Sequence, residues 1–573
     1  MKVRIPYHGR QQVRIGLIVL LLTLFTAIGS SSIPAGAQAD TTEEPAATPD
    51  ATPQPPAQTA GDSGKVLAWI GSGRSAESRP ASSPSELGYL NARGEWELLL
   101  NLPQSFVGVY PCGDRALSPD GRRFTFLVHE PRAGKDGGTL YQITDAGQPV
   151  AVGPAHALTC VGGDPFQYSP DSQRLAYIDF NYSVDRIYVA GVLRLVNAET
   201  LQPIAEYGSA ASFTLSDREL FFTRFYANQS GAVDEIAVMR ATLAAEGAPE
   251  TEIATLFVPS GCRFTSAQIT PIFGKLAILA GQRCASGSQW QLYTLNRDGG
   301  ALQSSAGVGS GGFAPQTRTA WTIPSWDDRH LLFSVPDGSL NNTARIFTLP
   351  MESGTVDSRA ALIESGVRFP GYTFNRFPSS NFAMPQISPN GRYWAMLASG
   401  TAGNRLQVID RAQPSVAFEL IFVPGTISQL FFSPDSRTLY ATNGETTGAA
   451  NRLQSWDLTT LVVEAAADVS TEEPTADVPP ASTILEGAYG RTVIYPDGKA
   501  VAAVIWQRGT DSRQTLYQTL ARISLEDGSV LSSLLAPQQM IRYNETTGMV
   551  NFQRFVYPLA VLGTAPTANQ TTP

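Results

Sequence analysis

The chain has 573 residues, a formal net charge of −9 and a hydrophobic fraction of 43%. Its 51 glycines and 40 prolines are typical of a globular β protein with many turns, and they exclude neither an enzyme nor a binding module. Lys and Arg total 41 and form no basic patch, so we expect no nucleic-acid partner.

Residues 1–39 have the pattern of a signal peptide. Basic residues come first, Gly16 to Ile28 form an apolar core, and Ala37 and Ala39 each end a small-x-small cleavage site. The alternative is an uncleaved membrane anchor, although the apolar run is short for a span of ~20 residues. Both interpretations export the chain. We therefore expect a secreted, periplasmic or cell-surface protein, with membrane contact only through this segment if it stays uncleaved.

Residues 40–64 form a tract of Thr, Pro, Ala and Glu without periodicity. Such a tract buries too little apolar surface to offset its ordering entropy. We expect a disordered tether between the signal peptide and the folded domain.

From Lys65 onward, a short turn motif recurs next to apolar strands. Ser118-Pro119-Asp120-Gly121 is the first copy, and equivalent motifs begin at Ser169, Ser388, Ser433 and Tyr495. Pro presets φ at the first corner, Asp or Asn accepts hydrogen bonds from the turn backbone, and Gly tolerates positive φ. We assign a structural role in the turns to Asp120, Asp171, Asn390, Asp435 and Asp497.

The spacing of this motif predicts the architecture. Ser118 and Ser169 are 51 residues apart, and degraded copies near Ser216, Thr270 and Ser325 fill the long interval before the later motifs. A period of roughly 40–50 residues with several strands per unit is typical of β-propeller blades. Each unit has a second half with further strands, so we expect four antiparallel strands per blade.

The pattern of Ser-Pro-Asp-Gly, an apolar strand, a second apolar strand and Asp-x-Gly resembles the TolB-type, WD-repeat-like β-propeller repeat. The resemblance covers most of the chain from Lys65 to about Pro537, and it implies a propeller that acts as an interaction platform at the cell envelope. The small α/β domain that precedes the propeller in that family has no counterpart before Lys65. The resemblance therefore concerns the repeat alone.

We expect one all-β propeller over residues 65–562 with eight blades, and seven or nine blades as alternatives. Nine unit starts occur along the chain, but the first, near Lys65, lacks its own turn motif. The strand beginning at Lys65 could complete a blade that the C-terminal segment begins. Two further Pro-containing tracts are expected to be disordered: a loop at residues 465–482, between the last two repeats, and a tail at residues 563–573.

Four cysteines fit an exported protein. Cys112 and Cys160 occupy similar places at the starts of adjacent repeats, so a bridge between neighbouring blades is natural. Cys262 and Cys284 flank one hairpin and could pair within a blade. The alternative is four free buried thiols. No Cys-x-x-Cys occurs, which argues against a zinc site or a redox dithiol.

The sequence contains no recognisable catalytic constellation. It lacks the Gly-x-Ser-x-Gly elbow and a phosphate-binding loop, and its histidines are scattered without metal-ligand spacing. The turn acids come one per repeat, whereas a Ca²⁺ site needs several converging oxygen ligands. We therefore predict no catalytic residue, no metal site and no cofactor.

Aromatic residues crowd a Gly- and Pro-containing stretch between two repeats, from Arg368 to Pro385. A loop of this length between blades is often functional. The alternative is that these side chains pack over the propeller face. The candidate binding residues of this loop are Phe369, Tyr372, Phe374, Phe377 and Phe382.

Together these features favour an exported, non-enzymatic propeller that binds a protein or a glycan at the cell envelope. The alternative is a propeller hydrolase or lyase acting on extracellular polymers, with carboxylates and arginines in a central funnel. A third interpretation is a purely structural surface protein.

Overall fold

A computed structural model gives the fold of the chain. It describes residues 3–4, 65–72, 85–90, 95–102, 108–110, 116–132, 135–144, 147–156, 166–184, 187–244, 247–272, 274–304, 309–310, 321–324, 330–336, 344–350, 361–368, 386–400, 403–412, 417–420, 426–444, 452–461, 481–486, 488–508, 516–544, 549–552 and 554–563. The described strands all belong to the compact unit made of Met1–Ile5 and Asp62–Pro573. No helix among the described residues is long and apolar enough to cross a membrane.

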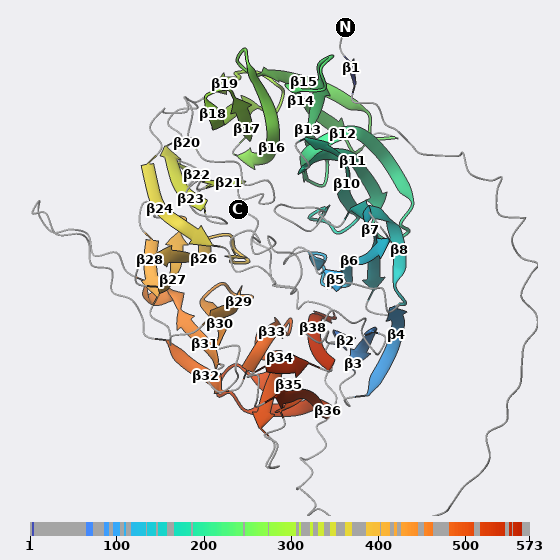
Figure 1. Ribbon diagram of the computed structural model, residues 1–573, viewed down its shortest axis with the longest axis vertical. Coiled ribbons are helices and arrows are strands. Elements are labelled where there is room, and N and C mark those ends of the chain that lie inside the picture. The colour runs from blue at the N-terminus through green and yellow to red at the C-terminus, as the bar shows by residue number, and fades with distance from the viewer. Residues whose placement is uncertain are drawn as a thin grey trace, which may run out of the picture. The chain divides into compact units, whose positions relative to one another are not determined.

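The described elements are almost entirely β-strands, and they form seven hydrogen-bonded sheets (Figure 1). Sheet 1 orders β38 (Arg554–Leu562), β2 (Lys65–Ser72), β3 (Ser85–Leu90) and β4 (Trp96–Leu102). Sheet 2 orders β5 (Gly108–Tyr110), β6 (Arg123–Arg132), β7 (Lys135–Thr144) and β8 (Val150–His156).

Sheet 3 has eight strands: β9 (Phe166–Tyr168), β10 (Arg174–Val184), β11 (Ile187–Asn197), β12 (Pro203–Leu215), β13 (Glu219–Ala227), β14 (Val233–Thr242) and β15 (Glu250–Phe257), with β1 (Val3–Arg4) paired to β13. Sheet 4 contains β16 (Cys262–Ile272), β17 (Lys275–Cys284), β18 (Gly287–Asn296), β19 (Gln303–Ser304) and β20 (Gly309–Ser310).

Sheet 5 also has eight strands: β21 (Trp321–Pro324), β22 (His330–Pro336), β23 (Ala344–Pro350), β24 (Ala361–Arg368), β25 (Gln386–Ile387), β26 (Tyr393–Gly400), β27 (Gly403–Asp410) and β28 (Ala417–Leu420). Sheet 6 orders β29 (Thr426–Phe432), β30 (Thr438–Gly444), β31 (Arg452–Asp457) and β32 (Ser482–Glu486), with a 3-10 turn η4 (Leu458–Thr460) after β31. Sheet 7 orders β33 (Ala488–Ile494), β34 (Ala500–Arg508), β35 (Leu516–Ser524), β36 (Val530–Asn544) and β37 (Met549–Phe552).

The turn motif builds the hairpin that the sequence predicts. In sheet 3, Tyr168 at the end of β9 pairs with Leu175 at the start of β10, and Ser169 to Ser172 form the turn between them. The same strand–turn–strand arrangement joins β25 to β26, β29 to β30, and β33 to β34. The motif therefore marks the passage from the first strand of each repeat to the second.

The sheets contact one another in a closed series. Contacts join β8 to β10, β12 to β16, β16 to β21, β25 to β29, β29 to β33, β33 to β38 and β38 to β6, which returns to sheet 2. Figure 1 shows the strands arranged around a common centre. A closed ring of antiparallel, mostly four-stranded meanders is a β-propeller.

The chain closes the ring through its two ends. The C-terminal strand β38 lies next to β2, and Trp69 pairs directly with Tyr557. This confirms the expectation that the strand beginning at Lys65 completes a sheet to which the C-terminal segment contributes. In this position β38 covers the edge of β2, whose backbone groups would otherwise template pairing with another chain.

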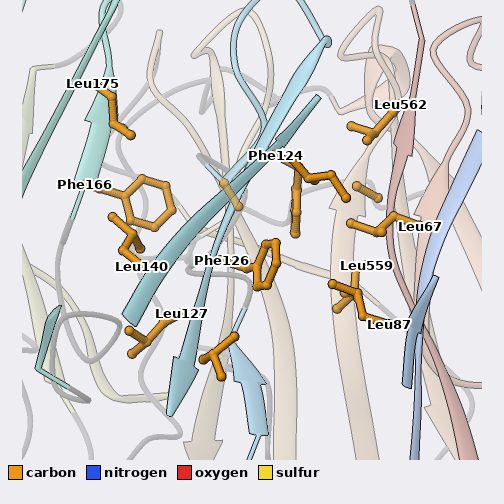
Figure 2. Close-up of a cluster of buried hydrophobic side chains, with 14 of the residues drawn as sticks. Leu67, Leu87, Phe124, Phe126, Leu127, Leu140, Phe166, Leu175, Leu559 and Leu562 are labelled. Carbon is orange, nitrogen blue, oxygen red and sulfur yellow. The ribbon is translucent and has the colours of Figure 1, made fainter. Parts of the chain in front are cut away.

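Hydrophobic clusters fill the spaces between neighbouring sheets. One cluster joins Leu67 of sheet 1, Phe124 and Phe126 of sheet 2, and Phe166 and Leu175 of sheet 3 (Figure 2). A strand between two such clusters is buried on both faces, as in β13, where Leu220 to Tyr226 are all buried. Each large side chain buried in this way stabilises the fold by about 1.5–3 kcal/mol.

Two predictions from the sequence differ from the observed sheets. The preferred count of eight blades is not confirmed, because the sheets number seven in the described part of the chain and two of them run through two successive repeats. The prediction that the tract at residues 465–482 lies between the last two repeats is wrong, because β31 before it and β32 after it pair within sheet 6. The tract's last residue, Ser482, is the first residue of β32.

Candidate functional site

The repeated turns share one set of local hydrogen bonds. In the first, Gly121 N donates to Ser118 O at 2.8 Å, and Ser118 Oγ donates to Asp120 Oδ1 at 2.5 Å. The same carboxylate oxygen accepts the backbone N–H of Arg122 at 3.1 Å, and the N–H of Arg123 donates to Ser118 Oγ at 2.9 Å. One carboxylate oxygen thus holds the corner between the first two strands of the repeat.

The other predicted turn residues occupy the same place. Asp171 Oδ1 accepts from Ser169 Oγ at 2.5 Å, and Asn390 Oδ1 accepts from Ser388 Oγ at 2.7 Å. Asp435 Oδ1 accepts from Ser433 Oγ at 2.5 Å, and Asp497 Oδ1 accepts the N–H of Lys499 at 3.0 Å. Asn390 lacks a charge but supplies the same acceptor, so the shared requirement is the oxygen and not the negative charge.

Arginines stand beside several turn carboxylates. Asp120 Oδ2 lies 2.9 Å from Arg123 Nη1, Asp171 Oδ2 lies 3.6 Å from Arg174 Nη1, and Asp497 Oδ2 lies 3.7 Å from Arg522 Nη2. At Asp435, partial burial raises the pKa, but the Ser433 hydroxyl, the Arg437 N–H and the Arg437 charge outweigh it and lower the pKa overall. At Asp435 these contacts favour the ionised carboxylate as part of the turn.

Neighbouring turns also bond to each other. The backbone N–H of Asp120 donates to Ser172 Oγ at 3.1 Å, and that of Asn390 donates to Ser436 Oγ at 2.9 Å. Between the next pair of repeats, the N–H of Asp171 donates to Asp217 Oδ1 at 2.9 Å. The turns thus form hydrogen-bonded links between successive repeats at one end of the sheets.

These hydrogen bonds show the role of the turn residues at this end of the sheets. The turn acids hold corners and join repeats, and they do not converge on a common point. Within the described part of the chain, no group of three or more His, Cys, Asp or Glu side chains is arranged to hold a metal ion. The histidines after the N-terminal segment lie in three separate strands: His129 in β6, His156 in β8 and His330 in β22.

The opposite end of sheet 4 carries a disulfide. Cys262 begins β16 and Cys284 ends β17; they are direct cross-strand partners, with an S–S distance of 1.98 Å. This confirms the predicted bridge within one blade. Cys112 and Cys160, the other predicted pair, lie outside the described residues, so their bridge stays a prediction.

The predicted aromatic loop lies outside the described residues. This applies to Phe369, Tyr372, Phe374, Phe377 and Phe382. The described chain leaves sheet 5 at Arg368 and re-enters it at Gln386, the first residue of β25.

A polar cluster that the sequence did not reveal lies close to the disulfide. Between Phe264 and Ser266 the register of β16 shifts against β17, as in a β-bulge. Thr265 Oγ1, Ser266 Oγ and Gln268 Oε1 are buried and have no hydrogen-bond partner among the described residues. The order of apolar and polar residues in this strand does not indicate a bulge. The cluster could therefore be found only from the pairing register of β16 and β17.

Comparisons with known proteins give likenesses of fold only. No protein-family model matches the chain, and no curated protein matches its sequence. Among solved structures, a eukaryotic initiation factor is 11% identical, with a TM-score of 0.41 over 88% of this chain and 100% of that one. An oligogalacturonate lyase in complex with manganese is 11% identical, with a TM-score of 0.35 over 66% of this chain and 94% of that one. The β-propeller domain of the Trilobed protease from Pyrococcus furiosus is 11% identical, with a TM-score of 0.32 over 59% of this chain and 93% of that one. Likeness at this level transfers no activity to the chain.

Proposed function

We propose that this protein is an exported, non-enzymatic β-propeller that binds a protein or a glycan at the cell envelope. The proposal rests on the hydrogen bonds that the polar residues of the repeated turns make. The turn residues Asp120, Asp171, Asn390 and Asp435 bond to their own turn, and the first three also bond to the next repeat. The repeat therefore builds a rigid scaffold, and recognition is left to the connections at the other end.

The proposal includes the organisation of the chain. Residues 1–39 act as a signal peptide, residues 40–64 as a tether, residues 65–562 as the propeller and residues 563–573 as a tail. The repeat is of the TolB-like, WD-repeat-like kind. We infer nine blades, because sheets 3 and 5 each contain two successive meanders, which join at β12 and between β24 and β26. This number equals the nine unit starts in the sequence.

Export is supported by two independent features. The basic and apolar pattern before Ala39 is that of a secretion signal. The Cys262–Cys284 disulfide fits an oxidising compartment, because thiols in the cytosol are kept reduced. We therefore place the folded domain outside the cytoplasm, in the periplasm, at the cell surface or in the medium.

Affinity capture from the native cell envelope tests the function. The bait is the fragment from Asp40 to Pro573, and the control bait is the same fragment after thermal unfolding. We expect the folded bait to enrich one protein or glycan fraction that the unfolded bait does not retain. Failure to enrich any component, together with breakdown of a polysaccharide or peptide in a substrate panel, would contradict the platform and favour an enzyme.

A further inference from the structure

Strand β12 separates from β13 before β13 ends. The residues of β12 from Ala210 to Leu215 pair with β13, and the last of these pairs joins Ala210 to Arg224. The earlier part of β12 pairs with β11 instead. At this point Ser209 has a φ of 58° and the register shifts beside Ala210, so the strand bends away. β13 continues to Ala227 without pairing to β12.

The side chain of Arg224 fixes this separation. Its Nε donates to Gly208 O at 3.0 Å, on the part of β12 that has left β13. Its Nη1 donates to Glu250 Oε1 at 2.8 Å, and the arginine side chain is only 5% exposed. A buried guanidinium that is bonded to both a carbonyl and a carboxylate holds a defined geometry. The separation of the two strands is therefore built into the fold.

The end of β13 directs backbone groups to the side that β12 has left. Just after the strand, Asn228 N donates to Ala232 O in the hairpin with β14 at 2.8 Å. Neighbouring residues of a strand direct their N–H and C=O groups to opposite sides, so those of Ala227 point away from β14. By the same alternation, those of Phe225 also point away from β14. A strand edge of this kind can pair with an added strand.

Strand β1 shows how such a strand is added. Val3 pairs with Ala227 and Arg4 pairs with Tyr226, in antiparallel register. Val3 therefore stands opposite the residue whose backbone groups face this edge. β1 lies within residues 1–39, which act as a signal peptide in the proposed function. Removal of that peptide on export leaves the edge to another segment.

Sheet 2 has a proline at the corresponding position. The C=O of Arg123 accepts a bond from the turn before β6, and backbone directions repeat at every second residue, so Pro131 faces the same side as Arg123. In sheet 3, the C=O of Glu219 accepts from its own turn in the same way, and Ala227 follows Glu219 at the same interval. Proline has no N–H and blocks strand addition, whereas Ala227 keeps its donor.

We propose that the end of β13, from Phe225 to Ala227, binds an extended peptide segment of a protein partner by strand addition. The bonds come from the backbone, so many sequences fit, provided that the residue opposite Ala227 is not proline. A glycan lacks this ladder of alternating N–H and C=O groups. The site lies at the end of β13 away from its turn, where the proposed function places recognition. The inference rests on that function and names the partner as a protein.

A synthetic peptide with the sequence of residues 1–5, Met-Lys-Val-Arg-Ile, tests the site directly. Fluorescence anisotropy measures its binding to the fragment Asp40–Pro573, which lacks β1. We expect saturable binding. The same peptide with an N-methyl group on the backbone nitrogen of Val3 cannot donate to Ala227 O, so it should bind about tenfold more weakly.

Two substitutions at one position connect the binding to β13. Ala227→Pro removes the N–H that faces the added strand and leaves the pairing with β14, so it should weaken peptide binding about tenfold. Ala227→Ser keeps the N–H and is the matched control, with a change of less than about twofold. Pro131 in β6 shows that the fold tolerates proline at this place, and circular dichroism checks that both variants are folded.

The same variants serve as baits in the envelope capture. The Ala227→Ser fragment should enrich the same protein as the unaltered fragment, and the Ala227→Pro fragment should lose it. Added peptide should displace that protein from the unaltered fragment, because both occupy one strand edge.

Several results would overturn the site. They are no binding of the peptide, equal binding of its N-methylated form, and equal binding by the Ala227→Pro fragment. Capture of a glycan, or of a protein that the Ala227→Pro bait retains equally well, would overturn the site and leave the platform in place. Capture that enriches nothing contradicts the platform itself, and the peptide measurements then decide the site.

Discussion

At the residue scale, the fourth position of the turn separates two kinds of repeat. It is glycine in three copies, at Gly121, Gly391 and Gly498, where φ is positive. In the other two copies it is serine, and Ser172 and Ser436 adopt φ of 59° and 63°. This conformation costs roughly 1–2 kcal/mol for a residue with a Cβ. Serine is retained because each hydroxyl accepts a hydrogen bond from the preceding turn.

Substitution of Ser172 separates these two effects. Ser172→Ala keeps the strained φ and leaves the Asp120 N–H without its acceptor, so it should lower the free energy of unfolding by about 0.5–1.5 kcal/mol. Ser172→Gly loses the same bond but relieves the strain, so its stability should stay close to that of the unaltered protein. Urea unfolding measures both. A glycine variant less stable than the alanine variant would contradict this explanation.

Asp435 gives a pH-dependent test of the turn. Its pKa is lowered in the folded state from an ordinary value of 3.8. A carboxyl whose pKa is lowered by folding contributes stability at higher pH, and this contribution is lost as the pH falls through the folded pKa. Asp435→Asn keeps the acceptor oxygen, as Asn390 does naturally. The variant should therefore be slightly less stable than the unaltered protein at pH 7, and the difference should disappear in acid below the folded pKa.

Urea unfolding at several pH values checks this prediction, with Asp435→Ala as the control that loses the acceptor at every pH. A deficit of Asp435→Asn that is equally large at neutral and acid pH would show that charge contributes nothing at this turn.

The sequence indicated these local roles but not the bonds between repeats. Turn chemistry depends on neighbours in the chain, so Asp120 and Asn390 could be assigned from the motif alone. The bond from Asp120 to Ser172 joins residues 52 apart, and that from Asn390 to Ser436 joins residues 46 apart. Neither motif indicates which other turn lies beside it, because the neighbouring turn is set by the packing of the sheets in the ring.

At the element scale, the hairpins could be predicted from the sequence, but the sheet to which each strand belongs was harder to predict. Cys262 and Cys284 could be paired from the sequence because they flank one apolar hairpin, and the register places them opposite each other. The tract at residues 465–482 was misplaced, because a long polar tract looks like a boundary between repeats. It instead separates β31 and β32, the third and fourth strands of one sheet. The bulge at Thr265 left no mark in the pattern of residue types.

The disulfide should stabilise its hairpin by limiting the unfolded chain. Its cysteines are 22 residues apart in the sequence. Closing a loop of this size is worth about 2–4 kcal/mol. The double variant Cys262→Ser/Cys284→Ser should lose about this much free energy of unfolding, measured without added reductant so that Cys112 and Cys160 are left in their native state. A double variant as stable as the unaltered protein would mean that strand pairing alone holds this end of sheet 4.

At the scale of the whole molecule, closure depends on the two ends of the domain. Strand β38 completes sheet 1, and Val556, Leu559, Val561 and Leu562 are buried in clusters that adjoin sheets 2 and 7. The sequence allowed this closure because both segments are apolar and strand-like. It did not fix the number of blades, because degraded turn motifs do not show whether a sheet ends or continues into the next repeat.

Truncation tests the closure. A chain that ends at Gln553 loses β38 and exposes the edge of β2, together with the surface that the buried side chains of β38 covered. We expect a loss of more than ~5 kcal/mol, seen as a markedly lower melting temperature and as association of the truncated chains. A chain that ends at Gly563 keeps β38 and should melt like the full chain. If both truncations melt alike, β38 does not close the ring.

The proposed function requires that this closed scaffold binds a protein or a glycan and leaves it chemically unchanged. The decisive experiment incubates the fragment Asp40–Pro573 with the protein or glycan fraction that envelope capture enriches, and measures both the bound fraction and the partner's molecular mass in the same sample. We expect retention of the partner with no change in its mass over a prolonged incubation. Progressive breakdown of the partner, lost on thermal unfolding of the protein, would contradict the proposal.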